Sequence, residues 1–156
     1  MNNSDTAAAA HAARSKTDLA LETFDRAAGF NCAQSVFSAF CEDFGLNRET
    51  ALKLSCGFGG GMGRCGQACG AVSGAVMALG LKYGKYLRED NESKEKTYAA
   101  VQEFIRLFTE RNRTVSCNEL VGVDIKTADI QLVKDITAKV CPGFVKDAVE
   151  ILETLL

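Results

Sequence analysis

Apolar residues recur every three to four positions along most of the chain, and this spacing predicts α-helices with one buried face. The expected helices span residues 16–28, 32–44, 48–55, 93–111, 129–139 and 142–156, and a further one begins between Gly66 and Cys69 and ends near Tyr83. A further short helix is expected to begin at Cys117. Little strand-like alternation is present, so we predict an all-α, single-domain bundle of at least five helices, with no sheet beyond an isolated bridge.

The same spacing predicts which side chains face the core. In the first expected helix these are Leu19, Ala20, Phe24, Ala27 and Ala28. In the helix over residues 93–111, which has the clearest amphipathic pattern, they are Tyr98, Val101, Phe104, Ile105 and Phe108. Residues that commonly cap helices precede three expected starts, at Asn31, Asn47 and Ser116. Cys141-Pro142 predicts another start, because proline is common at the first helical position.

A chain of 156 residues is long enough for one domain with its own core, and no linker divides it. We expect a mobile tail over residues 1–15 and a single helical domain over residues 16–156. The net charge of −2 argues against nucleic acid or an anionic membrane as a partner. The first residues lack the pattern of a secretory signal, and no window is suited to spanning a bilayer. A cytoplasmic location with reduced thiols is therefore expected.

The most unusual stretch is CGFGGGMGRCGQACGAVSGAVMALGLKYG, residues 56–84, which combines cysteines with glycines. Glycine lets backbone approach a neighbouring group closely, so we predict backbone wrapped around a sulfur-centred site. The glycines expected to contribute to a cofactor site are Gly59, Gly60, Gly61 and Gly70. No strand precedes the run and no Gly-Lys-Ser/Thr closes it, so neither a P-loop nor a dinucleotide fingerprint is present and no nucleotide cofactor is expected.

The helix after the glycine run is expected to be the central one. Gly66, Gly70 and Gly74 recur four residues apart, which predicts one helix face for the close approach of another helix or a cofactor. Such a face could also serve self-association, so a homodimer is the default expectation.

Seven cysteines are the chemically informative residues, at positions 32, 41, 56, 65, 69, 117 and 141. An odd number in a chain of this length is a poor match to a secreted disulfide framework. Neither C-x2-C nor C-x-x-C-H occurs, so zinc ribbons, thioredoxin-type dithiols and covalently attached haem are not supported. His11, the only histidine, lies in the expected tail and is not expected to act as a ligand or base.

Four of the cysteines fall at, or within a turn of, an expected helix start: Cys32, Cys69, Cys117 and Cys141. Unpaired N–H groups and the helix dipole favour a thiolate there and lower the pKa of a cysteine. Four such thiolates close together would repel one another unless a metal, an iron–sulfur cluster or disulfide formation relieved the repulsion. We therefore expect these four residues to converge as metal ligands. Cys41, which lies on an apolar stripe, is expected to be a core residue.

At these residues the chain resembles the C_GCAxxG_C_C family of redox-active proteins, a domain also found in split-Soret cytochrome c. The resemblance covers about residues 18–155 and is carried by FNCAQ at 30–34, the glycine run, CGAVSG at 69–74, CNEL at 117–120 and Cys141. The four cysteines of the family map onto Cys32, Cys69, Cys117 and Cys141. The resemblance implies redox activity through cysteines, with an iron–sulfur centre as the candidate cofactor. Haem does not carry over, because its attachment motifs are missing.

Three interpretations remain open. The first is a protein with an iron–sulfur cluster or another thiolate-ligated metal, which transfers electrons with a redox partner protein or senses redox state. The second is a metal-free thiol–disulfide oxidoreductase, with Cys69 as the attacking thiol and Cys65 or Cys117 as its resolving partner. Cys65 and Cys69 would share one face if the segment between them were helical. The third is a structural helical module whose cysteines fill the core. An enzyme of this kind would be an oxidoreductase.

Overall fold

The computed structural model describes residues 14–25 and 27–156, and every regular element in them is a helix. In chain order these are α2 (Lys16–Phe24), α3 (Cys32–Phe40), the 3-10 helix η1 (Cys41–Phe44), α4 (Arg48–Ser55), the 3-10 helix η2 (Cys56–Phe58), α5 (Gly59–Met62), α6 (Gly70–Tyr83), α7 (Asn91–Asn112), α8 (Cys117–Val121) and α9 (Ile130–Leu155). The described residues contain only an isolated β-bridge, between Ala68 and Ser116. The all-α prediction is therefore confirmed. Most of the predicted tail, including His11, lies outside the described residues.

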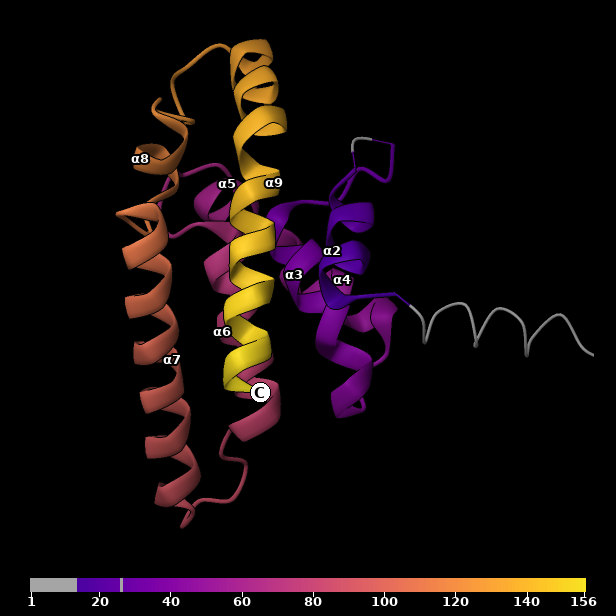
Figure 1. Ribbon diagram of the computed structural model, residues 1–156, viewed down its shortest axis with the longest axis vertical. Helices are drawn as coiled ribbons and strands as arrows, with labels where there is room; N and C mark the ends of the chain where they lie inside the picture. The colour runs from indigo at the N-terminus through magenta and orange to yellow at the C-terminus, as the bar shows by residue number, and fades with distance from the viewer. Residues whose placement is uncertain (1–13, 26) are drawn as a thin grey trace, which may run out of the picture.

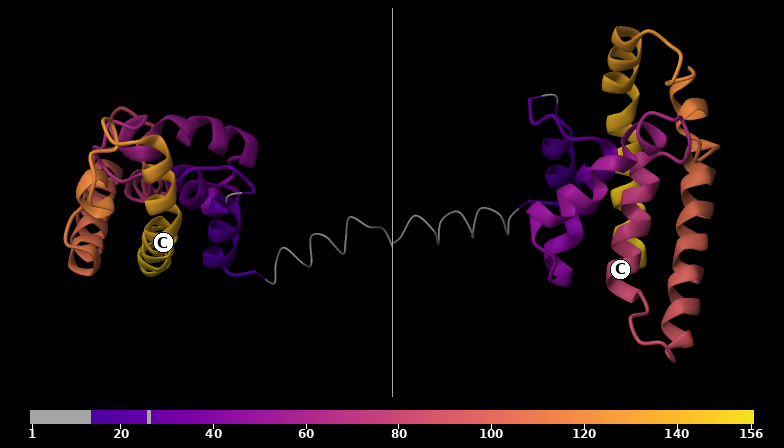
Figure 2. Two further views of the ribbon diagram at one scale, coloured as in Figure 1. Left: turned by 90° about the horizontal axis from the view of Figure 1, so that it is seen from above. Right: turned by 180° about the vertical axis from the view of Figure 1, so that it is seen from behind.

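The long helices α6, α7 and α9 lie side by side, and the shorter α2, α3 and α4 pack along one side of them (Figures 1 and 2). Helix α6 contacts α3, α7 and α9, as expected for the central helix of the bundle. The largest fully buried side chains between these helices are Phe104, Phe108, Leu79, Ile151 and Leu152. No helix in the described part of the chain combines the length and apolar character that crossing a membrane requires.

Helix starts follow the polar caps in the sequence. The Asn31 side chain accepts a hydrogen bond from the Gln34 N–H, and the Gln34 side chain accepts one from the Asn31 N–H, which makes a capping box before α3. The Asn47 side chain accepts a hydrogen bond from the Thr50 N–H at the start of α4, and the Ser116 hydroxyl accepts one from the Glu119 N–H at the start of α8. All three predicted caps are confirmed, because local hydrogen bonding decides these boundaries.

The first helix is shorter than predicted. Helix α2 ends at Phe24, and Ala27 and Ala28 lie exposed outside it. The carboxylate of Asp25 accepts a hydrogen bond from the Ala27 N–H at 2.7 Å, which replaces the helical bonding pattern with a turn. The apolar spacing alone could not reveal this competing hydrogen bond.

The predicted break at Cys141-Pro142 is absent, because α9 runs through Pro142 as one helix. Proline removes one helical hydrogen bond and costs about 3 kcal/mol in a helix interior. The apolar face continues across this point, with Val133, Cys141, Val145, Ala148 and Val149 buried. Packing on both sides of the proline therefore outweighs its local cost, and Cys141 is not at a helix start.

Helix α7 buries a narrower face than predicted. Phe104 and Phe108 are fully buried and stack with ring centroids 5.9 Å apart. Tyr98 and Ile105, which were expected to face inward, are 54% and 38% exposed. Only α6 and α9 make extensive contact with α7, so one face of this helix is left to solvent.

The predicted glycine face is correct for Gly70 and Gly74 but wrong for Gly66. Gly66 precedes α6 and has φ +70°, so it belongs to the loop. A Cβ atom on Gly74 would lie 2.6 Å from the carbonyl oxygen of Ala33, which shows how closely α3 approaches α6 here. The small residues therefore serve helix packing within the bundle.

Gly74→Ala is expected to lower the free energy of unfolding by up to about 2 kcal/mol. The clash with the backbone of α3 costs about 1–3 kcal/mol, and the better helix propensity of alanine returns about 1 kcal/mol. Gly80→Ala in the same helix is the matched control, because a Cβ there meets no atom within 4 Å and should stabilise the protein. Urea unfolding measures both, and equal effects of the two changes would contradict the packing described here.

Candidate functional site

Five of the seven cysteines line one cavity of ≈ 830 Å³: Cys32, Cys69, Cys117 and Cys141, and the exposed Cys56. The wall of this cavity comes from α2, α3, the glycine loop before α6, α8 and the first half of α9. Cys69, Cys117 and Cys141 are 2%, 6% and 5% exposed, and Cys32 is half-buried. The structure therefore brings together cysteines that lie as much as 109 positions apart in the sequence.

Cys32 owes its position to the capping box at the start of α3. It is the first residue of the helix, directly after Asn31. The Asn31 side chain also donates a hydrogen bond to the carbonyl oxygen of Cys56 at 2.9 Å, which ties the start of α3 to the end of α4. The same asparagine thus starts the helix and fixes the segment that leads into the glycine loop.

Cys69 and Cys117 are held next to each other by backbone hydrogen bonds. The Cys69 N–H donates to the Val115 carbonyl at 2.8 Å, and the Cys117 N–H donates to the Gln67 carbonyl at 2.7 Å. The bridge between Ala68 and Ser116 lies between these two bonds. This pairing aligns the start of α6 with the start of α8.

Cys141 reaches the cavity from the middle of α9. It lies on the buried face of that helix, directly before Pro142. Of the four cysteines predicted at helix starts, Cys32, Cys69 and Cys117 lie there, whereas Cys141 does not. Its position in the site comes from tertiary packing of α9 and owes nothing to a helix dipole.

The glycine loop contains a left-handed turn. Residues 60–64 all have φ between 56° and 67°, including the non-glycine residues Met62 and Arg64. Each of these two residues costs about 1–2 kcal/mol relative to a right-handed conformation. Two backbone hydrogen bonds across the loop help to hold the turn. One runs from the Gly66 N–H to the Gly60 carbonyl, and the other from the Gln67 N–H to the Gly61 carbonyl.

Two glycines let the backbone lie close to cysteine side chains of the site. A Cβ atom on Gly61 would lie 2.7 Å from Cβ of Cys117, and one on Gly70 would lie 3.2 Å from Cβ of Cys32. Gly59, Gly60 and Gly70 line the cavity, and Gly61 is buried. The expected close wrapping of backbone around sulfur is present, whereas the cofactor-binding role of these glycines stays a prediction.

The four thiols influence one another's ionisation. The interaction with Cys141, together with burial and the charges of Cys69 and Cys117, raises the pKa of Cys32 well above its usual range. The same interaction lowers the pKa of Cys141. The titrations of Cys32 and Cys141 are therefore linked.

The expected low pKa of Cys69 is wrong. Burial raises the pKa of this thiol to about 11, although hydrogen bonds from the Ala71 and Val72 backbone lower it in part. Burial likewise raises the pKa of Cys117 to about 12, with further contributions from Cys69 and Cys141. Desolvation of a thiolate thus exceeds the effect of a helix start at both positions.

The remaining cysteines lie in three different settings. Cys41 is fully buried in the main core, and its thiol donates to the Ser38 carbonyl, in agreement with its predicted structural role. Cys56 is exposed and lines the cavity. Cys65 is exposed and does not line the cavity. The segment between Cys65 and Cys69 is not helical, so these two do not share a helix face.

The residues that could hold a soft metal are the four cysteines of the cavity, because thiolates are the donors that iron–sulfur clusters, zinc and cuprous copper prefer. Among residues 14–25 and 27–156, however, no group of three or more His, Cys, Asp or Glu side chains is arranged to hold a single metal ion. The donor set thus suits a thiolate-ligated centre, whereas the sulfurs do not surround one point as a mononuclear site requires.

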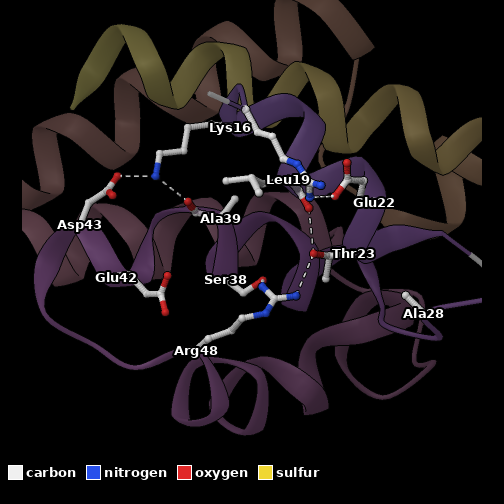
Figure 3. Close-up of a pocket in the computed structure, with 11 residues that line it drawn as sticks. Lys16, Leu19, Glu22, Thr23, Ala28, Ser38, Ala39, Glu42, Asp43 and Arg48 are labelled. Carbon is white, nitrogen blue, oxygen red and sulfur yellow. Dashed lines mark hydrogen bonds and ion pairs between the residues drawn. The ribbon is translucent and has the colours of Figure 1, made fainter. Parts of the chain in front are cut away.

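A second cavity, of ≈ 490 Å³, lies against α2, α3, η1 and α4 and contains no cysteine (Figure 3). The Arg48 guanidinium donates to the hydroxyls of Ser38 and Thr23, and Lys16 pairs with Asp43. These bonds tie α2 to the helices beneath it, which gives this polar cluster a structural role.

Sequence analysis did not assign Phe24, Phe30, Phe144 or Arg64 to the cysteine site. Phe24, Phe30 and Phe144 contribute to its apolar wall, and Arg64 reaches it from the left-handed turn. Helical periodicity assigned Phe24 to the core, and no sequence signal marks Arg64 as a cavity residue.

The fold and the site define an all-α protein with four cysteines gathered in one cavity. The chain belongs to the family described as "Putative redox-active protein (C_GCAxxG_C_C)", whose sequence model matches residues 30–155, and this membership supports a redox role. An uncharacterized protein from Archaeoglobus fulgidus is 28% identical over 128 residues, which cover 78% of this chain and 81% of that protein. No solved structure shows significant similarity to the chain.

Proposed function

We propose that the protein is a cysteine-based redox protein in which Cys32, Cys69, Cys117 and Cys141 bind an iron–sulfur cluster. The observation that carries this proposal is that these four cysteines, from separate segments of the chain, line one cavity, with Cys69, Cys117 and Cys141 buried. Four cysteines are the usual ligand set of such clusters. When bound, a cluster would take up and release single electrons.

The arrangement of the sulfurs favours a cluster over a single ion. Each cysteine of a four-iron cluster binds its own iron, so the ligands stand farther apart than around one metal ion. This spacing agrees with four cysteines that line one cavity without surrounding a common point.

Binding of a cluster would change the ionisation of the four thiols. In the thiol form, burial and mutual repulsion oppose ionisation of Cys69 and Cys117. A cationic centre reverses that repulsion and stabilises the thiolates. Cys32, Cys69 and Cys117 lie at the starts of α3, α6 and α8, where the helix dipole favours negative charge.

Purification without oxygen tests the proposal. The full chain is expected to be brown, with charge-transfer absorption and with iron and acid-labile sulfide in stoichiometric amounts. The quadruple Cys→Ser variant at positions 32, 69, 117 and 141 is expected to be colourless. A wild-type protein that retains no iron after anaerobic purification and after reconstitution with iron and sulfide would contradict a cluster.

The position of Cys32 and Cys141 in the wall of one cavity, and the strong interaction between their thiols, support a second candidate, a metal-free dithiol. Oxidation of the pair would release two protons and two electrons and form one disulfide between the two sulfurs. Diamide, which accepts both electrons and protons, is the test oxidant. Peptide mapping is expected to find a Cys32–Cys141 disulfide, and a disulfide that involves neither residue would exclude this pair.

A further inference from the structure

The cavity that the four cysteines line has room for a further molecule. Its volume of ≈ 830 Å³ lies within the range of about 300–1,000 Å³ that is typical of sites for small organic ligands. Apolar side chains make up much of the rest of the wall: Phe24, Phe30, Leu120, Ile125, Val133 and Phe144. The redox centre therefore faces a space suited to an apolar molecule.

The charged residues of this cavity are Arg64, Lys134 and Asp25, so positive side chains outnumber negative ones. Arg64 is exposed and comes from the left-handed turn, where its own φ is +67°. A Cβ atom on Gly60 would lie 3.0 Å from Cγ of Arg64, so the absence of a side chain there lets the arginine stem lie against the loop. The guanidinium can pair with a carboxylate or sulfonate, for which its planar fork is suited.

We propose that this cavity binds a small organic anion with a largely apolar, aromatic body and places it directly against the four-cysteine site. The apolar wall accepts the body of the molecule, and Arg64 pairs with its acidic group. The assignment of this molecule as the redox partner of the cysteines rests on the proposed function, whereas its binding does not.

8-Anilinonaphthalene-1-sulfonate combines an aromatic body with one acidic group and fluoresces in apolar surroundings, which makes it a suitable probe. The full chain is expected to bind one molecule per protein. Arg64→Gln is expected to weaken binding about fivefold, the effect of losing one partly solvated ion pair. Arg113→Gln is the matched control, because Arg113 also has a left-handed backbone, with φ +71°, and does not line the cavity. Equal affinities of the two variants would overturn the role of Arg64.

A second variant tests the cavity itself. Ala138 lies in α9, is half-buried and lines the cavity. Ala138→Leu keeps a good helix former but fills part of the space, so probe binding is expected to fall at least tenfold with unchanged helical circular dichroism. Ala99→Leu, on the exposed face of α7, is the control and should bind the probe as the wild type does. Unchanged binding by Ala138→Leu would place the probe elsewhere and overturn the proposal.

Iron content and disulfide formation, measured on the same samples, separate this inference from the proposed function. Probe binding that depends on Arg64 and Ala138, in a protein that binds no iron and forms no Cys32–Cys141 disulfide, would contradict the proposed function and support the cavity as a ligand site. A protein that keeps its redox chemistry but does not bind the probe would overturn the inference alone.

Discussion

Cys69→Ser is expected to abolish iron retention and to leave the thermal midpoint nearly unchanged. Cys69 is the N-cap residue of α6. Serine is a preferred residue at this capping position, so the helix keeps its start while the site loses one soft ligand. Iron analysis, the rate of thiol alkylation and thermal unfolding together give the result.

Cys41→Ser is the matched control for this change. Cys41 is fully buried outside the cavity, so the serine hydroxyl is buried among apolar groups and a loss of about 1–2 kcal/mol is expected. That corresponds to a midpoint lower by about 2–8 °C for a protein of this size. Iron content should be unchanged. Loss of the chemistry in Cys41→Ser, together with its retention in Cys69→Ser, would contradict the site.

Alkaline pH is expected to destabilise the metal-free, reduced protein strongly. The pKa values of Cys69 and Cys117 rise from 9.0 to about 11 and about 12 on folding. The folded state therefore keeps protons that the unfolded chain has already lost, and stability falls as pH rises above about 9. Two such thiols together lower the free energy of unfolding by up to about 2.7 kcal/mol per pH unit. The pKa of Cys141 is lowered on folding, so the stabilisation that this thiol contributes is lost as pH falls.

Urea unfolding at about pH 8 and about pH 10.5, with reductant and chelator present, measures this dependence. Tyrosine and lysine side chains also titrate in this range, so the control is the double variant Cys69→Ser/Cys117→Ser. Its stability should depend less steeply on pH than that of the wild type. Identical slopes for the two proteins would show that the two thiols are not protected from ionisation by the fold.

Much of the fold could be predicted because local interactions decide it. The caps at Asn31, Asn47 and Ser116 lie where side-chain hydrogen bonds to the backbone require them. The apolar spacing of Phe104 and Phe108 likewise identified a buried helix face. Cys32 and Cys117 were placed correctly because each directly follows such a cap.

The remaining features depend on contacts between distant segments. Cys141 reaches the cavity only because packing carries α9 through Pro142. The raised pKa of Cys69 comes from burial, which sequence spacing does not report. The position of Arg64 follows from a left-handed turn, and no local signal predicts that turn at a non-glycine residue.

Differential alkylation with mass spectrometry tests the central claim most directly, namely that four specific cysteines form one redox site. Anaerobically purified protein is alkylated before and after chelation and reduction under native conditions, and each cysteine is quantified. We expect Cys32, Cys69, Cys117 and Cys141 to be protected together in the purified protein and to become reactive together afterwards. Exposed Cys56 and Cys65 should react in both states. Protection of Cys56 or Cys65 in place of one of the four, or release of the four at unrelated rates, would contradict the account.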